Sequence, residues 1–114
     1  MLEPAELAQK KCKPCEGGTL PLSGEEISAL LPKFPGWAFT RGTLEKPFSF
    51  KNYYETTAFV NAVVWIAHTE NHHPDIEFGY KTCKIRYSTH AIKGISENDF
   101  ICVAKIEALG LRSI

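Results

Sequence analysis

The chain has 114 residues, with 13 acidic and 13 basic side chains and a formal net charge of zero. This length suits one domain around one core, and balanced charge without a run of Lys or Arg argues against direct binding of nucleic acid. No apolar stretch could span a bilayer, and the first residues lack a basic region followed by an apolar one, so we expect a cytoplasmic protein.

Residues 1–22 form a leader whose glycines and proline favour an irregular path, with helical structure expected only in the first few residues. The leader contains Cys12-Lys13-Pro14-Cys15, the only CxxC of the chain. A structural zinc site normally needs two such pairs, or one pair with histidines. We therefore favour a turn over a metal or redox site at Cys12 and Cys15, and leave open a zinc site shared with His68. The cysteine pattern shows no disulfide framework, which fits a reducing compartment.

Two elements are expected after the leader. Ser23-Gly24-Glu25-Glu26 is a capping box that starts a helix, and Pro32 ends it. Large apolar and small residues alternate from Gly36 to Thr40, and an extended pattern resumes from Leu44 to Phe50. With a turn at Arg41-Gly42 between them, these segments predict a β-hairpin.

A second helix is expected over residues 52–72, capped by Asn52 and Glu55 and ended by Pro74. One face carries an apolar stripe, and further apolar residues cover much of the remaining circumference. The stripe consists of Phe59, Ala62, Val63 and Ile66, and the other residues are Val60, Val64, Trp65 and Ala67. A helix that is apolar nearly all round must be buried nearly all round. We therefore expect a homodimer or homotetramer joined through this helix.

The rest of the chain predicts two strands and a final helix. Apolar residues alternate from Ile76 to Tyr80 and again from Cys83 to Tyr87, with a phase slip near Lys81 that indicates a turn or bulge. Ser96-Glu97-Asn98-Asp99 is a second capping box before an apolar helical stripe. The order α-β-β-α-β-β-α over residues 23–114 predicts an α+β domain, with a four-stranded antiparallel sheet and helices packed on one face.

All four histidines, His68, His72, His73 and His90, fall in the second half of the chain. A histidine changes charge near neutral pH, so such a group suggests acid–base chemistry or a metal. His68 and His72 are spaced i and i+4 on the expected helix and could share a metal ion, but there is no HExxH and Glu70 is poorly phased to join them. In the acid–base hypothesis, the helix end favours protonated His72 and His73, His90 follows the last strand, and Asp99 orients an imidazole.

The spacing His68-x-x-x-His72-His73-Pro74, followed by Tyr80, His90 and Asp99, resembles the signature of the pterin-4a-carbinolamine dehydratases. The resemblance covers about residues 23–112 and includes Gly36-Trp37 and Ser88-Thr89-His90. It implies a 4a-hydroxytetrahydrobiopterin dehydratase, a hydro-lyase that needs no metal or cofactor, takes a pterin as substrate and serves tetrahydropterin recycling. Some members also act as dimerisation cofactors of homeodomain transcription factors.

The resemblance also implies roles for single residues. His72 and His90 match the proton-transfer histidines, His73 matches a catalytic residue that contacts substrate, and Asp99 and His68 stand in supporting positions. His68 replaces a carboxylate that many relatives carry. The substrate-binding set implied by the resemblance is Asn71, His72, His73, Ser88, Thr89, His90, Ala91 and Trp37. Two alternatives stay open, namely an interaction module without catalysis and a pterin-binding protein of molybdenum cofactor metabolism.

Overall fold

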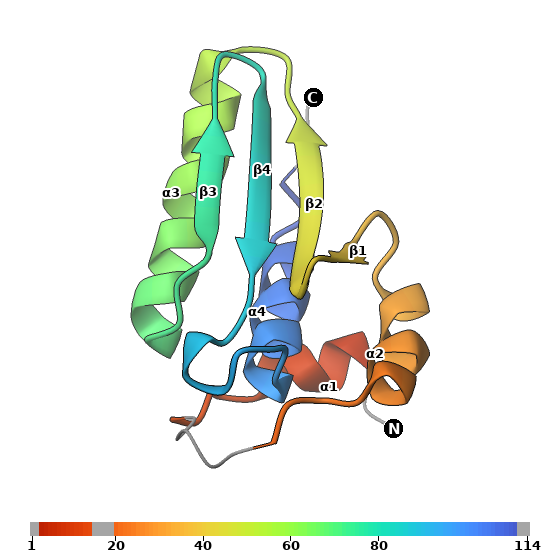
Figure 1. Ribbon diagram of the computed structural model, residues 1–114. Coiled ribbons are helices and arrows are strands. Elements are labelled where there is room, and N and C mark those ends of the chain that lie inside the picture. The colour runs from red at the N-terminus through yellow and green to blue at the C-terminus, as the bar shows by residue number, and fades with distance from the viewer. Residues whose placement is uncertain (1–2, 15–19, 112–114) are drawn as a thin grey trace.

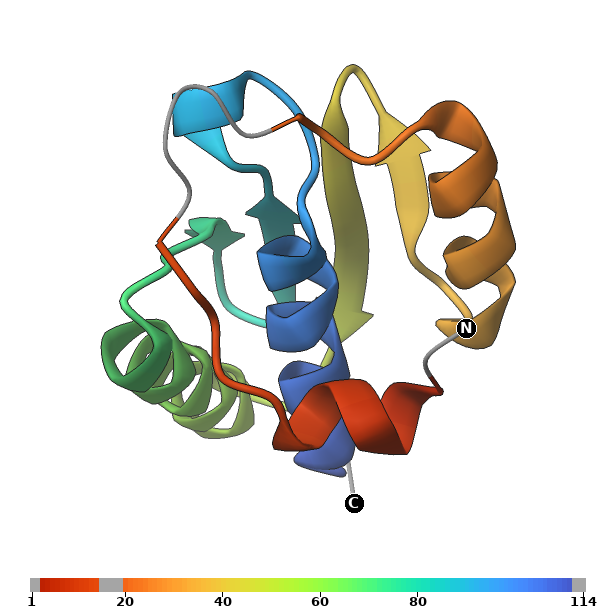
Figure 2. The ribbon, with the colours of Figure 1, turned by 90° about the horizontal axis from the view of Figure 1, so that it is seen from below.

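The computed structural model describes residues 3–14 and 20–111 (Figure 1). Four strands form one antiparallel sheet in the order β1-β2-β4-β3, made of β1 (Ala38–Thr40), β2 (Thr43–Ser49), β3 (Asp75–Phe78) and β4 (Thr82–Tyr87). The longer helices, α3 (Tyr53–Glu70) and α4 (Glu97–Ala108), cover the same face of the sheet (Figures 1 and 2). Two shorter helices, α1 (Pro4–Gln9) and α2 (Gly24–Leu30), and the 3-10 turns η1 (Leu31–Lys33) and η2 (His90–Ile92) complete the fold. The α+β prediction is confirmed.

Local signals set the element boundaries where the sequence predicted them. The Ser23 hydroxyl accepts from the Glu26 N–H at 3.1 Å, and the Glu26 carboxylate accepts from the Ser23 N–H at 2.9 Å, which closes the capping box of α2. Arg41 and Gly42 join β1 to β2 with φ of 53° and 78°. Both angles are left-handed, as the tight turns of hairpins require.

The predicted phase slip near Lys81 is a turn and not a bulge. It joins β3 to β4, and Ile76 then pairs with Ile85 and Phe78 with Cys83. The alternation in β4 buries Cys83, Ile85 and Tyr87 completely. The Tyr87 end of β4 carries the chain directly into the segment that holds Ser88, Thr89 and His90.

Helix α3 ends earlier than the sequence suggested. The prediction placed its end at His72, but the helix stops at Glu70 because Asn71 takes the left-handed conformation with φ of 52°. Asn71 and His72 then donate their backbone N–H groups to the last free carbonyls of the helix. This turn removes His72 from the helix and directs the chain toward the end of β4.

Helix α4 is surrounded by protein. Its residues from Asn98 to Ala104 are all buried, which exceeds the single stripe that the sequence indicated. The outer face is covered by α1, which crosses α4 on the side away from the sheet (Figure 2). Leu7 of α1 is only 1% exposed, and the Lys105 ammonium donates to the Ala8 carbonyl at 2.7 Å. Much of the leader is therefore packed against the domain.

Candidate active site

A cavity of about 450 Å³ opens where the end of α3, the end of β4, the start of α4 and the leader meet. Its walls hold three of the four histidines, namely His72, His73 and His90. Asn71, Ser88, Thr89 and Ala91, for which the resemblance implied contact with substrate, also line it, together with six further residues, Cys12, Lys13, Pro14, Thr69, Glu70 and Asn98. The volume falls within the range typical of small-molecule sites.

His72 and Asp99 form the central contact of this site. His72 Nε2 lies 2.6 Å from Asp99 Oδ1, and the Asp99 side chain is fully buried. Because an ionised carboxylate only accepts, Nε2 carries the proton of this hydrogen bond and Nδ1 is the nitrogen that Asp99 leaves uncommitted. The imidazole also stacks on the Tyr87 ring at 5.3 Å between centroids, which fixes its plane.

The second oxygen of Asp99 belongs to the helix cap. Asp99 Oδ2 accepts from the Ser96 backbone N–H at 2.9 Å and from the Thr89 hydroxyl at 2.7 Å. Both roles that the sequence suggested for Asp99 are therefore present in one side chain, since Oδ2 caps α4 while Oδ1 holds the imidazole. Thr89 is buried, and its hydroxyl lies 2.8 Å from that of Ser96.

The environment of His72 favours the imidazolium form. Burial of the ring lowers the pKa of His72, but the hydrogen bond and the charge of Asp99 outweigh that penalty, so the pKa is raised above its ordinary value of 6.5. A histidine that keeps its proton near neutral pH is suited to act as an acid.

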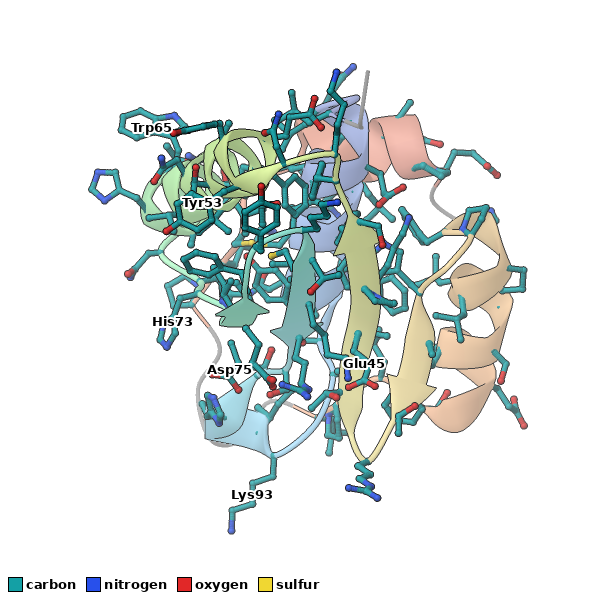
Figure 3. All side chains as sticks on the ribbon, turned by 90° about the horizontal axis from the view of Figure 1, so that it is seen from above. Glu45, Tyr53, Trp65, His73, Asp75 and Lys93 are labelled. Atoms are coloured by element: carbon teal, nitrogen blue, oxygen red, sulfur yellow. The ribbon has the colours of Figure 1, made fainter. Side chains whose placement is uncertain are left out.

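His73 and His90 border the same cavity in a more exposed setting. His73 follows the α3 end and lies at the periphery of the molecule (Figure 3). His90 is the first residue of η2, immediately after the segment that leaves β4. His73 and His90, from two different segments, thus line one cavity beside His72 and the buried Asp99 carboxylate.

Two predicted site residues lie elsewhere. His68 is exposed on α3 and packs against the Trp65 ring at 5.4 Å, while Trp65 points away from the sheet (Figure 3). Since His72 is no longer on the helix, the proposed i, i+4 metal pair of His68 and His72 does not form. Trp37 is buried in the core, and its indole N–H donates to Glu107 at 3.1 Å, away from the residues that line the cavity.

The leader is the part of the site that the sequence did not predict. The Cys12 N–H donates to the buried Glu70 carboxylate at 2.8 Å, and the Lys13 N–H donates to the Asn98 side-chain oxygen at 3.0 Å. The Asn98 amide group returns a hydrogen bond to the Lys13 carbonyl at 2.5 Å. Nothing in the local sequence around Cys12 or Glu70 indicated this contact between residues 58 positions apart.

The zinc hypothesis at Cys12 and Cys15 falls partly outside the described residues. Cys15 lies outside the described residues, and the neighbours of Cys12 are Cys102, Asn98 and Glu70, with no contact to His68. Across residues 3–14 and 20–111 no three His, Cys, Asp or Glu side chains gather as metal ligands would. In the same ranges, none of the helices has the length and apolar character needed to cross a membrane.

Comparisons with known proteins agree on one family. Residues 20–109 match the model of the family described as Pterin 4 alpha carbinolamine dehydratase. A Nitrosospira multiformis protein named "Putative pterin-4-alpha-carbinolamine dehydratase" is 61% identical over 104 residues, which are 91% of this chain and 92% of that protein. A Nitrosomonas europaea protein of the same name is 52% identical over 110 residues, covering 96% of this chain and 97% of the relative.

Two solved structures resemble this fold. A transcriptional coactivator/pterin dehydratase from Brucella melitensis aligns with a TM-score of 0.75 and 23% identity, over 78% of this chain and 97% of that one. A pterin dehydratase-like protein identified as a RuBisCO assembly factor in the alpha-carboxysome aligns with a TM-score of 0.56 and 26% identity, over 68% and 89% of the two chains.

Proposed function

The chain belongs to the pterin 4 alpha carbinolamine dehydratase family, and we propose that it removes water from a 4a-hydroxytetrahydropterin to give the quinonoid dihydropterin. We place this reaction in tetrahydropterin recycling. The observation that carries the proposal is the contact of His72 with the buried Asp99 carboxylate, at the wall of a cavity shared with His73 and His90.

The reaction needs two proton transfers close together. The C4a–OH bond breaks as a proton is delivered to the hydroxyl, which leaves as water, and N5 loses its proton as the C4a=N5 double bond forms. An acid and a base on one side of a bound ring meet both needs. The product has gained no electrons and lost none, so the step is an elimination that side-chain proton transfer is able to catalyse without a metal.

In our proposal His72 is the acid. Asp99 raises its pKa and holds Nε2, which leaves Nδ1 for the proton exchanged with substrate. His90, which starts η2 on another wall, is the base that takes the N5 proton. His73 contacts the pterin, the polar groups of Asn71 and Ser88 at the cavity wall orient it, and Thr89 lines the wall while its hydroxyl holds Asp99.

The test is the rate of 4a-hydroxytetrahydropterin dehydration, measured in chelator for the unmodified chain and for His72→Ala. We expect acceleration that survives chelation and falls roughly 10²-fold or more in the variant, the usual contribution of one general acid. His68→Ala is the matched control, since it removes an exposed imidazole outside the cavity and should keep the full rate. A folded chain that gives no acceleration, or a His72→Ala variant as fast as His68→Ala, contradicts the proposal.

A second function has its own observation. Val64 and Trp65 leave an apolar area on the outside of α3, with Trp65 65% exposed. Of the two solved neighbours, one is a transcriptional coactivator/pterin dehydratase and the other is a RuBisCO assembly factor. We propose α3 as the surface for self-association into a dimer or tetramer. The alternative is that α3 binds another protein, which requires that its apolar surface stays accessible in the dimer.

A further inference from the structure

Two thiols that the proposed reaction does not use lie side by side at the edge of the cavity. Cys12 Sγ is 3.7 Å from Cys102 Sγ and 3.6 Å from the Asn98 carbonyl oxygen. Cys102 is fully buried on α4, whereas Cys12 is half-buried in the leader and lines the cavity. The pair therefore has one member at the cavity wall, Cys12, and one member, Cys102, that is buried behind it.

The contact is held by the backbone on both sides of Cys12. Its own N–H is bound to Glu70, and both backbone groups of the following Lys13 are bound to the Asn98 side chain. Residues 11–14 lie outside any helix or strand, so closing the distance between the two sulfurs does not require a regular element to break. A disulfide needs about 2.05 Å between sulfurs, which is about 1.6 Å less than the present separation.

We propose that Cys12 and Cys102 are a redox-active pair that a small-molecule disulfide converts into an intramolecular disulfide. Cys12 attacks one sulfur of the small disulfide, releases the first small thiol and becomes a mixed disulfide. The Cys102 thiolate then attacks the Cys12 sulfur and releases the second small thiol. The protein loses two protons and two electrons, and the small disulfide gains them.

The surroundings suit Cys102 to the second step. In the reduced pair, the hydrogen bond with the Cys12 thiol lowers the pKa of Cys102 and raises that of Cys12. Once Cys12 has lost its S–H in the mixed disulfide, the Tyr87 hydroxyl is the hydrogen-bond donor that still lowers the pKa of Cys102 against the opposing effect of burial. Formation of the bond ties the leader to α4 and moves a wall of the cavity. Cys83 provides the contrast, because it is equally buried in β4 and burial raises its pKa to about 11.

The experiment exposes the full, folded chain to oxidised glutathione, alkylates the remaining thiols and counts them by intact mass. Of four cysteines, two thiols should remain. Cys15→Ser and Cys83→Ser each start with three thiols and should end with one, whereas Cys12→Ser should keep all three. Reduced glutathione in excess should restore the initial count.

Each other result overturns the pairing. If all three thiols of Cys15→Ser remain free, the disulfide forms within the CxxC and not with Cys102. If the product stops at a glutathione adduct on Cys12, Cys102 does not attack the mixed disulfide. If all four thiols of the unmodified chain remain free, Cys12 and Cys102 are not a redox-active pair. Because the readout is a mass, it is independent of whether the chain dehydrates pterins, and a failure of the proposed function leaves this test intact.

Discussion

At the scale of single residues, Asp99 does two jobs because its two oxygens face different groups. One oxygen completes the cap of α4 and the other binds His72, so the helix start and the imidazole are fixed by the same side chain. The sequence was able to predict Asp99 as a cap from local spacing. It could also suggest an imidazole partner, but only the fold shows that both contacts are made together.

Replacing Asp99 with Asn should lower the pKa of His72. The charge that raises the pKa is removed while the burial that lowers it remains, so the value should fall below that of the unmodified chain. NMR titration of the His72 ring measures this directly. Glu97→Gln, an exposed carboxylate in the same helical turn, is the control and should leave the titration in place. An unchanged His72 titration in Asp99→Asn would show that the contact is not electrostatic.

The same pair predicts how stability varies with pH. The pKa of His72 is raised in the folded state, so its contribution is fully present below the unfolded value of about 6.5 and is lost as pH rises through the folded value. At pH 6, His72→Ala should reduce the free energy of unfolding by about 1–3 kcal/mol, as expected when a buried carboxylate loses its hydrogen-bond partner. Denaturant titrations should show a smaller difference at pH 9. A difference that grows with pH would contradict this sign.

At the scale of elements, local signals were sufficient for most boundaries and insufficient for the leader. The cap at Ser23, the turn at Arg41-Gly42 and the alternation in β4 depend on neighbours in sequence, and all are found where expected. The binding of Cys12 to Glu70 joins residues 58 positions apart, and nothing in the local pattern of either segment indicates the other. The end of α3 was predicted at His72 from the position of Pro74. The helix ends two residues earlier because Asn71 adopts the left-handed conformation.

Glu70 should control how firmly the leader is held. It receives the Cys12 N–H and lies 3.6 Å and 3.7 Å from the Lys11 and Lys105 ammonium groups. Burial opposes its ionised form, but these contacts outweigh burial and lower its pKa. Its contribution is therefore present above the ordinary value of 4.5 and is lost as pH falls through the lowered value.

Glu70→Gln should loosen the leader without unfolding the domain. We expect a loss of about 1–3 kcal/mol in the free energy of unfolding, the range for weakening a buried charged contact, and faster amide hydrogen exchange at Cys12 and Lys13. Hydrogen exchange with mass spectrometry measures the second effect. Glu77→Gln, which removes an exposed ion pair with Arg86, is the matched control and should leave the free energy of unfolding almost unchanged. If amide exchange at Cys12 and Lys13 is equally fast in Glu70→Gln and Glu77→Gln, Glu70 does not hold the leader.

At the scale of the whole molecule, the two long helices differ in how much of their apolar surface the chain covers. Helix α4 is buried all round within one chain, because α1 of the leader covers the side that the sheet leaves open. Helix α3 has no such cover in the described part of the chain, and Tyr54, Val64 and Trp65 remain exposed on it. Composition alone could not distinguish the helix that the chain itself covers from the one that it leaves exposed.

Trp65→Glu should weaken self-association of the chain. A tryptophan at the centre of an interface commonly contributes 2 kcal/mol or more, so the dissociation constant should rise by at least about 30-fold. Sedimentation equilibrium of both proteins over a range of concentrations measures this change. Phe39→Glu is the matched control, because Phe39 is also an exposed aromatic residue but lies on β1, at the opposite edge of the sheet from α3 and β3. It should keep the association of the unmodified chain. If the unmodified chain sediments as a monomer throughout, or if Phe39→Glu dissociates it while Trp65→Glu does not, α3 is not the surface that joins the subunits.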